Sequence, residues 1–191
     1  MPSGVRVVRV PVYASTNRAW SRRALTYGTF GMMSMLRGLT LYDLDCLIAI
    51  TPLPTCLSAV VLSLVKRVPM ILDLQDIWPE GAMIAGALRP GLLYDAFERL
   101  EYWTYSKSSF VTVISEGFAE QLTANGVPRK KLVYIPNGVD VDFVHGAAPD
   151  EELARRYDLT DKFVVVFVGN HGLMQGLDYV LDAAKLLLDV K

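Results

Sequence analysis

The sequence predicts an α/β protein built on a doubly wound parallel sheet, and two observations lead to that fold class. Short apolar runs such as Met70–Leu74 (MILDL) and Phe110–Ile114 (FVTVI) are nearly continuous, as expected of strands buried on both faces. Stretches with helical periodicity separate these runs. Strands separated by helices connect through right-handed crossovers, so we expect a parallel sheet covered by helices on both faces.

The first half of the chain is expected to supply three strands and two helices. Val5–Val10 is rich in β-branched residues, which favours a strand. The helical stretch Ala19–Gly38 carries arginines and a methionine cluster that we interpret as core filling (Arg22, Arg23, Arg37; Met32, Met33, Met35). Cys46–Val65 has no charge over 20 residues, but its two prolines disfavour a membrane span. We expect a strand at Asp45–Ile50, a turn and a buried helix at Pro54–Lys66, followed by the strand Met70–Leu74.

The second half continues the alternation. Gly91–Lys107 is amphipathic: its aromatic residues are expected to pack, and Glu98, Arg99 and Glu101 to face solvent. After the strand Phe110–Ile114, Ser115 is placed to cap the helix Glu116–Ala124, and Asn125-Gly126 to end it. Leu132–Ile135 is the next strand.

One change in composition marks a domain boundary. The stretch from Pro136 to Asp161 is polar, acidic and rich in turn residues, as linkers are. We therefore expect a first domain over residues 1–145, a linker over 146–161, and the start of a second domain over 162–191. The second domain would open with the strand Phe163–Val168, a glycine-rich loop and the helix Leu177–Val190.

Composition excludes several classes of protein. The 191 residues are 52% hydrophobic and 20% charged, which is typical of a globular chain and not of a disordered one. A formal net charge of −1 gives no electrostatic case for nucleic acid as a partner. Cys46 and Cys56 have no metal-ligand spacing, so we expect reduced core residues. The amino terminus lacks a secretory signal, and we expect a cytoplasmic protein that is soluble or peripheral to the membrane.

Polar residues gather where the Met70–Leu74 strand ends. Asp73, Gln75, Asp76 and Glu80 lie at or just past this carboxyl end, and Pro79 prevents the strand from continuing. Ligands bind at that edge of open α/β sheets, so the cluster is a candidate site. The alternative is that Asp76 caps a turn and Asp73 pairs with a basic neighbour.

A second candidate site is the loop Gly169–Gly176 (GNHGLMQG). It has three glycines between a predicted strand and a predicted helix. Backbone N–H groups and a helix amino terminus in that geometry can hold a phosphate.

The motifs in order resemble the family 4 glycosyltransferases of the GT-B fold. They are DLQDIWPE, VIS at a strand end, VPRKKLVYIPNGVD and VVFVGNHGLMQGLDYVLDAAKLL. The likeness is strongest to bacterial sugar transferases that assemble surface polysaccharides such as O-antigen and colanic acid. It implies two Rossmann-like domains, the first binding the acceptor and the second the nucleotide-sugar donor. It also implies transfer with retention and no cofactor or metal.

The resemblance assigns roles to individual residues. Asp76 and Gln75 would form the catalytic loop. The acceptor would contact Asp73, Trp78, Glu80, Ser115 and Glu116, and the donor diphosphate Gly169, Asn170, His171, Gly172, Gln175 and Gly176. The acceptor would be a saccharide or a lipid-linked sugar, which suggests contact with the inner face of the cytoplasmic membrane.

The chain departs from the family pattern in places. Asn170 and Gln175 stand where many members have an arginine and a lysine, which shifts phosphate binding to backbone N–H groups and the helix dipole. The family's opening strand and loop, and most of the second domain, are not recognisable. We therefore expect a central fragment that is not a competent enzyme on its own.

A non-enzymatic alternative uses the same acidic residues. A doubly wound domain could be a Mg²⁺-binding or nucleotide-binding regulatory module, with Asp73 and Asp76 as ligands. The strand ends at Val10 and Ile50 offer no further carboxylate, so the glycosyltransferase interpretation is favoured.

Overall fold

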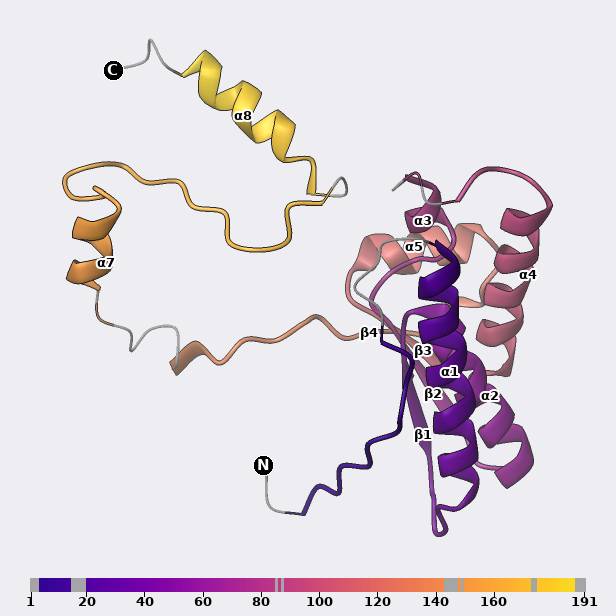
Figure 1. Ribbon diagram of the computed structural model, residues 1–191. Helices are drawn as coiled ribbons and strands as arrows, with labels where there is room; N and C mark the ends of the chain where they lie inside the picture. The colour runs from indigo at the N-terminus through magenta and orange to yellow at the C-terminus, as the bar shows by residue number, and fades with distance from the viewer. Residues whose placement is uncertain are drawn as a thin grey trace. The chain divides into compact units, whose positions relative to one another are not determined.

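The computed structural model describes residues 4–14, 20–84, 86, 88–142, 148, 150–172 and 175–187 (Figure 1). The side chains of Trp20, Ser21, Arg23 and Ile84 lie outside this description, as do His145 and parts of the linker predicted over 146–161. The chain divides into two compact units, Met1–Pro136 and Asn137–Lys191. The division falls at the start of the polar stretch. The exact domain limits at 145 and 161 stay predictions.

The first unit contains a four-stranded, fully parallel sheet in the order β1-β2-β3-β4. Its strands are β1 (Leu47–Ile50), β2 (Met70–Leu74), β3 (Phe110–Val113) and β4 (Leu132–Tyr134). The α/β class and the parallel Rossmann-like sheet are thereby confirmed. The uncharged stretch Cys46–Val65 is also a strand, a turn and a helix, as predicted. No helix in the described part of the chain is long and apolar enough to cross a bilayer.

Helices connect the strands. They are α2 (Leu53–Lys66) after β1, α3 (Glu80–Ile84) and α4 (Leu92–Lys107) after β2, and α5 (Glu116–Ala124) after β3. Of the helices that connect these strands, α3 was not expected from the sequence. Because the strand order is consecutive, right-handed crossovers place these helices on one face of the sheet. One buried cluster joins that face to α2, α4 and α5, with Leu72, Val60, Tyr105 and Leu122 among its members.

In the part of this unit that the structure describes, the opposite face of the sheet is only partly covered, so coverage of both faces by helices stays a prediction. Met70, Leu72 and Leu74 are buried under the helices, whereas the alternate positions Ile71 and Asp73 are half-buried. On β1, Ile48 is 68% exposed. Covering the second face would require the strand order to reverse, which these four strands do not do.

Helix α1 (Trp20–Leu39) packs on α2. Gly38 lies directly against the Leu62 side chain, and a Cβ at that position would overlap Leu62 Cδ1. Ser34 Oγ and Ser58 Oγ are 3.3 Å apart across the same interface. Lys66 Nζ donates to the carbonyl oxygens of Leu39 at 3.1 Å and Leu41 at 2.6 Å, which satisfies acceptors at the carboxyl end of α1.

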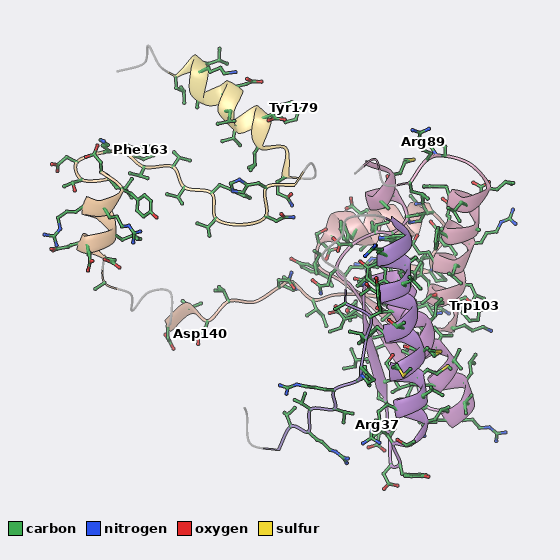
Figure 2. All side chains as sticks on the ribbon, viewed as in Figure 1. Arg37, Arg89, Trp103, Asp140, Phe163 and Tyr179 are labelled. Atoms are coloured by element: carbon green, nitrogen blue, oxygen red, sulfur yellow. The ribbon has the colours of Figure 1, made fainter. Side chains whose placement is uncertain are left out.

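Two predicted strands do not form. Val5–Val10 and Phe163–Val168 have strand-like sequences, but neither pairs with a strand among the described residues. Val5 is 61% exposed and Phe163 is 97% exposed, with its side chain in solvent (Figure 2). A strand is a hydrogen-bonded arrangement, so β-branched composition alone does not produce one.

The second unit consists of short elements. Helix α7 (Glu151–Arg156) is capped by Asp150, whose Oδ1 accepts the Leu153 N–H at 2.9 Å. Helix α8 (Leu177–Leu186) begins after Gly176, which has a left-handed φ of 56°. The carboxyl end predicted for this helix, at Val190, lies outside the described residues. No described side chain of this unit is fully buried.

Candidate functional site

Asp73 ties together the carboxyl ends of three strands. It stands opposite Thr112 in the β2–β3 register, and its Oδ1 accepts the Thr112 hydroxyl at 2.7 Å. Its Oδ2 accepts Gln75 Nε2 at 2.9 Å, and the Gln75 N–H donates to Thr51 Oγ1, beyond β1, at 3.0 Å. Both oxygens of Asp73 are therefore engaged by neutral donors. Within the described residues no basic residue pairs with Asp73, so the alternative that Asp73 pairs with a basic neighbour is wrong.

Asp76 has the opposite environment. It is exposed, and in the part of the chain that the structure describes it makes no hydrogen bond, ion pair or helix cap. The loop around it is nevertheless held firmly, since Leu74 before it and Pro79 after it are buried. Asp76 thus places an ionisable group in solvent on an anchored loop.

Trp78 and Glu80 anchor this loop to the helices. The Trp78 ring meets Phe97 of α4 edge to face, with centroids 5.1 Å apart and an interplanar angle of 84°. Glu80, the first residue of α3, accepts Gln121 Nε2 of α5 at 2.6 Å. The loop is therefore linked both to α4 and to α5.

Glu101 is the residue that sequence reasoning misplaced. We expected it in solvent, but it is 3% exposed. Its Oε1 accepts the Trp78 N–H at 3.0 Å and the Tyr105 hydroxyl at 2.6 Å. The sequence spacing indicates the burial of Glu101, because Phe97, Glu101 and Tyr105 recur every four residues and so share one face of α4.

Burial changes the pKa values of Glu101 and Tyr105. It raises the pKa of Glu101 to about 7, although the hydrogen bonds from Tyr105 and Trp78 act in the opposite direction. Burial and the neighbouring Glu101 raise the pKa of Tyr105. Burial also raises the pKa of the Cys56 thiol to about 11, consistent with a core residue, whereas Cys46 is exposed, against our prediction.

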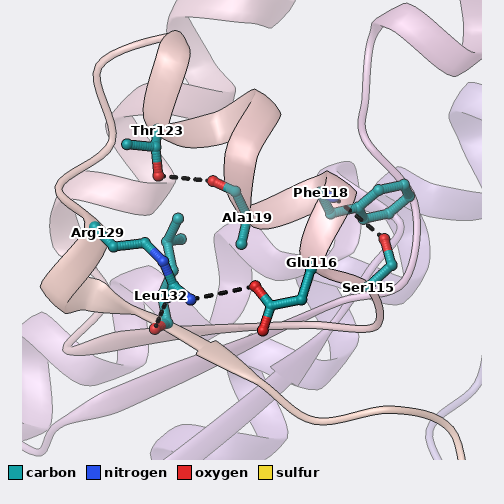
Figure 3. A network of polar contacts seen from close by, with 7 residues as sticks. All are labelled: Ser115, Glu116, Phe118, Ala119, Thr123, Arg129 and Leu132. Atoms are coloured by element: carbon teal, nitrogen blue, oxygen red, sulfur yellow. Dashed lines mark hydrogen bonds and ion pairs between the residues drawn. The ribbon is translucent and has the colours of Figure 1, made fainter.

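Ser115 and Glu116 lie at the end of β3 (Figure 3). Ser115 Oγ accepts the Phe118 N–H at 3.2 Å, so the predicted cap of α5 is confirmed. Glu116 pairs with Arg129 at 3.3 Å, and Arg129 also donates to the Leu132 carbonyl at 3.0 Å. Both partners of the ion pair are more than half exposed, so it adds at most about 1 kcal/mol of stability. Ser115 and Glu116 therefore each have a structural partner beside the candidate site.

The glycine-rich loop belongs to the second unit and is described within that unit. The Gly172 N–H donates to Gln175 Oε1 at 3.0 Å, and the Gln175 N–H donates to the Gly172 carbonyl at 3.2 Å. A Cβ on Gly172 would lie 2.8 Å from Gln175 Oε1, the end of an exposed side chain that would have to shift and give up this hydrogen bond. The His171 ring lies 5.6 Å from that of Phe167. Gly169 and Asn170 precede this turn, and Gly176 is the residue immediately before α8.

Metal ligands do not gather at either site. Among the described residues there is no group of three or more His, Cys, Asp or Glu side chains that could hold a metal ion. Asp73, which the regulatory-module alternative would use as a ligand, already accepts two hydrogen bonds.

Comparison with known proteins decides the family. Residues 1–138 match the family model described as the glycosyl transferase 4-like domain. The chain belongs to this family. The matched region contains the whole sheet and the loop from Gln75 to Glu80.

Two curated relatives are similar to this member of the family. The alpha-galactosylglucosyldiacylglycerol synthase of Streptococcus pneumoniae (strain ATCC BAA-255 / R6) is 31% identical over 110 residues, which cover 56% of this chain and 29% of the relative. The protein assigned as the colanic acid biosynthesis glycosyl transferase WcaI of Escherichia coli (strain K12) is 28% identical over 195 residues, covering 96% of this chain and 47% of the relative. The chain thus spans less than half the length of each of these relatives.

Proposed function

We propose that the protein is a retaining hexosyltransferase that moves a sugar from a nucleotide-sugar donor to a polysaccharide or lipid-linked acceptor, without a metal ion. The observation that carries the proposal is the family match over residues 1–138. The names of the two relatives support both acceptor classes, since one relative makes a glycosyldiacylglycerol and the other is assigned to colanic acid biosynthesis.

Asp76 is proposed as the catalytic group. Its exposed carboxylate on an anchored loop can approach the acceptor hydroxyl and accept or position its proton. Gln75, whose backbone N–H is fixed on Thr51, would orient the acceptor beside it. Trp78, Glu80, Asp73, Ser115 and Glu116 would form the surrounding acceptor wall.

The loop Gly169–Gly176 is proposed to hold the donor diphosphate. It precedes α8, and α8 has no side-chain cap, so its amino-terminal N–H groups are suited to an anion. Asn170, His171 and Gln175 add neutral polar groups, and the glycines allow close approach of the phosphate.

The test of this function is genetic. We expect deletion of the gene in its host to remove one sugar from a surface polysaccharide or glycolipid, and the wild-type gene to restore it. Asp76→Asn is expected to lower turnover by about 10²–10⁴-fold, the range for a lost acid–base group, and so to fail to restore it. Glu120→Gln, an equally neutralising change at an exposed site on α5, is the control. An unchanged sugar composition on deletion, or full restoration by Asp76→Asn, contradicts the proposal.

The acceptor class also suggests a membrane surface on α1 and α2. Exposed apolar side chains gather there, including Leu25, Met32, Leu36 and Leu64, each about half exposed. A groove of about 260 Å³ runs between the helices, lined by Tyr27, Met32, Met35, Leu57 and Val61 among others. The exposure of Met32 shows that the methionine cluster is not simply core filling.

We propose that this surface rests on the cytoplasmic face of an anionic bilayer, with exposed Arg22 and Arg37 near the headgroups. Met32→Glu with Leu36→Glu should abolish co-sedimentation with phosphatidylglycerol-containing vesicles at low salt. The same two charges placed on α4, by Leu92→Glu with Leu93→Glu at positions that are 89% and 54% exposed, should leave it unchanged. Absence of binding by the wild-type protein would reject this surface.

A further inference from the structure

Glu101 is a buried acid whose retention in the fold needs a physical reason. It is 3% exposed, and within the described residues no lysine or arginine pairs with it. A buried carboxylate without a countercharge costs stability, whereas a well-packed apolar side chain at the same place would not. Its partners therefore indicate what the group does.

Those partners connect α4 to the candidate catalytic loop. One carboxylate oxygen accepts both the Trp78 N–H and the Tyr105 hydroxyl. Tyr105 lies one helical turn further along α4 and is 2% exposed, so its hydroxyl keeps the carboxylate in a single orientation. The Trp78 N–H is only two residues beyond Asp76.

Other contacts hold the loop on both sides of this hydrogen bond. Phe97, one turn before Glu101, supports the Trp78 ring from the same helix face. On the far side the Gly81 N–H donates to the Ile77 carbonyl at 3.1 Å as α3 begins, and Glu80 is held by Gln121. The hydrogen bond from the Trp78 N–H to Glu101 thus connects the loop backbone to α4.

We propose that Glu101 is a positioning residue, whose buried carboxylate fixes the backbone of the 75–80 loop through Trp78 and thereby presents Asp76 at the carboxyl edge of the sheet. The consequence for catalysis rests on the function proposed above. The positioning itself does not depend on that function and is measurable without it.

Positioning by a carboxylate gives a signature that apolar packing would not. Burial brings the pKa of Glu101 to about 7, and the nearby acids Glu98 of α4 and Glu80 of α3 raise it further, while Tyr105 and Trp78 lower it. Protonation removes the charge from the acceptor of the Trp78 N–H and weakens that hydrogen bond. The loop should therefore be less ordered below neutral pH.

The experiment follows the Trp78 amide of the isotopically labelled 191-residue chain by NMR as pH is varied. The Trp78 amide proton is expected to titrate with a midpoint near the pKa of Glu101, in the wild type and in Glu120→Gln. In Glu101→Gln the titration should vanish. A Trp78 amide shift that is flat with pH, or one that still titrates in Glu101→Gln, overturns the proposal.

Hydrogen exchange then separates positioning from general stability. Glu101→Ala should speed exchange of the backbone N–H groups of residues 75–78 and 80 by at least about tenfold, the equivalent of one lost hydrogen bond to a charged acceptor. Protection of β2 should be unchanged. Glu101→Gln, whose neutral amide oxygen can still accept a weaker hydrogen bond, should recover part of the protection. Equal loss of protection in the loop and in β2 would show that Glu101 only stabilises the fold. A confirmed titration without sugar transfer would leave the positioning standing and reject the proposed function.

Discussion

At the scale of single residues, the two acidic residues Asp76 and Glu101 have opposite environments. Asp76 is exposed and unpartnered among the described residues, whereas Glu101 is buried and accepts two hydrogen bonds. Desolvation raises the pKa of Glu101 to about 7, so this buried group changes its protonation near neutral pH, whereas the Asp76 side chain is open to solvent and to an acceptor. That difference separates a group available for proton transfer from one that holds the loop.

The burial of Glu101 predicts how stability depends on pH. Because its pKa rises from 4.5 to about 7 on folding, the folded state binds the proton more tightly. Between these two values the stability contributed by Glu101 falls as pH rises, by up to about 1.4 kcal/mol per pH unit, and it levels off above the folded pKa. Glu101→Gln has no such dependence.

Thermal unfolding of both proteins across this pH range measures the effect. The Tm of the wild type minus that of Glu101→Gln should decline from about pH 5 to about pH 7. Parallel Tm curves would mean that Glu101 does not change its protonation on folding.

At the scale of elements, the sequence predicted strands and helices well where each strand has a partner. Met70–Leu74 forms as predicted, and Asp45–Ile50, Phe110–Ile114 and Leu132–Ile135 form in slightly shorter versions. Val5–Val10 is rich in β-branched residues and forms no strand. Local composition carries β-propensity, but pairing depends on distant segments that composition does not specify.

The candidate site was predictable only in part. Proline and acidic residues after an apolar run located the loop, and the helix cap at Ser115 follows from residue type. The hydrogen bonds from Gln75 to Thr51 and from Thr112 to Asp73 join different strands, so they require the register. The role of Glu101 was missed because a glutamate on an amphipathic helix is usually solvated.

The α1–α2 interface gives a prediction at this scale. Gly38→Ala should lower the free energy of unfolding by about 1–3 kcal/mol, because the new Cβ would displace the buried Leu62 side chain. Gly28→Ala lies on the same helix, and its new Cβ would meet no neighbouring atom within 4 Å, so it should raise the free energy of unfolding by about 0.5–1 kcal/mol through helix propensity. Urea unfolding of both variants measures these changes in the free energy of unfolding. A stabilising effect of Gly38→Ala would mean that α1 and α2 pack less closely than described.

At the scale of the whole molecule, the two units differ in how much core they have. Among the described residues, all of the buried apolar side chains fall before Pro136. Without buried surface, little offsets the ~1–2 kcal/mol of backbone entropy lost per ordered residue. The second unit should therefore open far more readily than the first.

Limited proteolysis measures that difference. Cleavage should occur first between Gly146 and Asp161 and leave a resistant amino-terminal core that contains the sheet. Equal protection on both sides of this segment, in a monomer, would show that the two units share one core.

We propose that this member of the glycosyl transferase 4-like family transfers a sugar by means of the Asp76 loop. It is tested most directly on the protein purified from its own host, supplied with host membrane lipids and with nucleotide sugars labelled in the sugar. Label from one donor is expected to enter the lipid or polymer fraction. Asp76→Asn is expected to reduce the rate by about 10²–10⁴-fold, whereas Glu120→Gln is expected to leave it unchanged. No transfer from any donor, or transfer at the wild-type rate by Asp76→Asn, would contradict it.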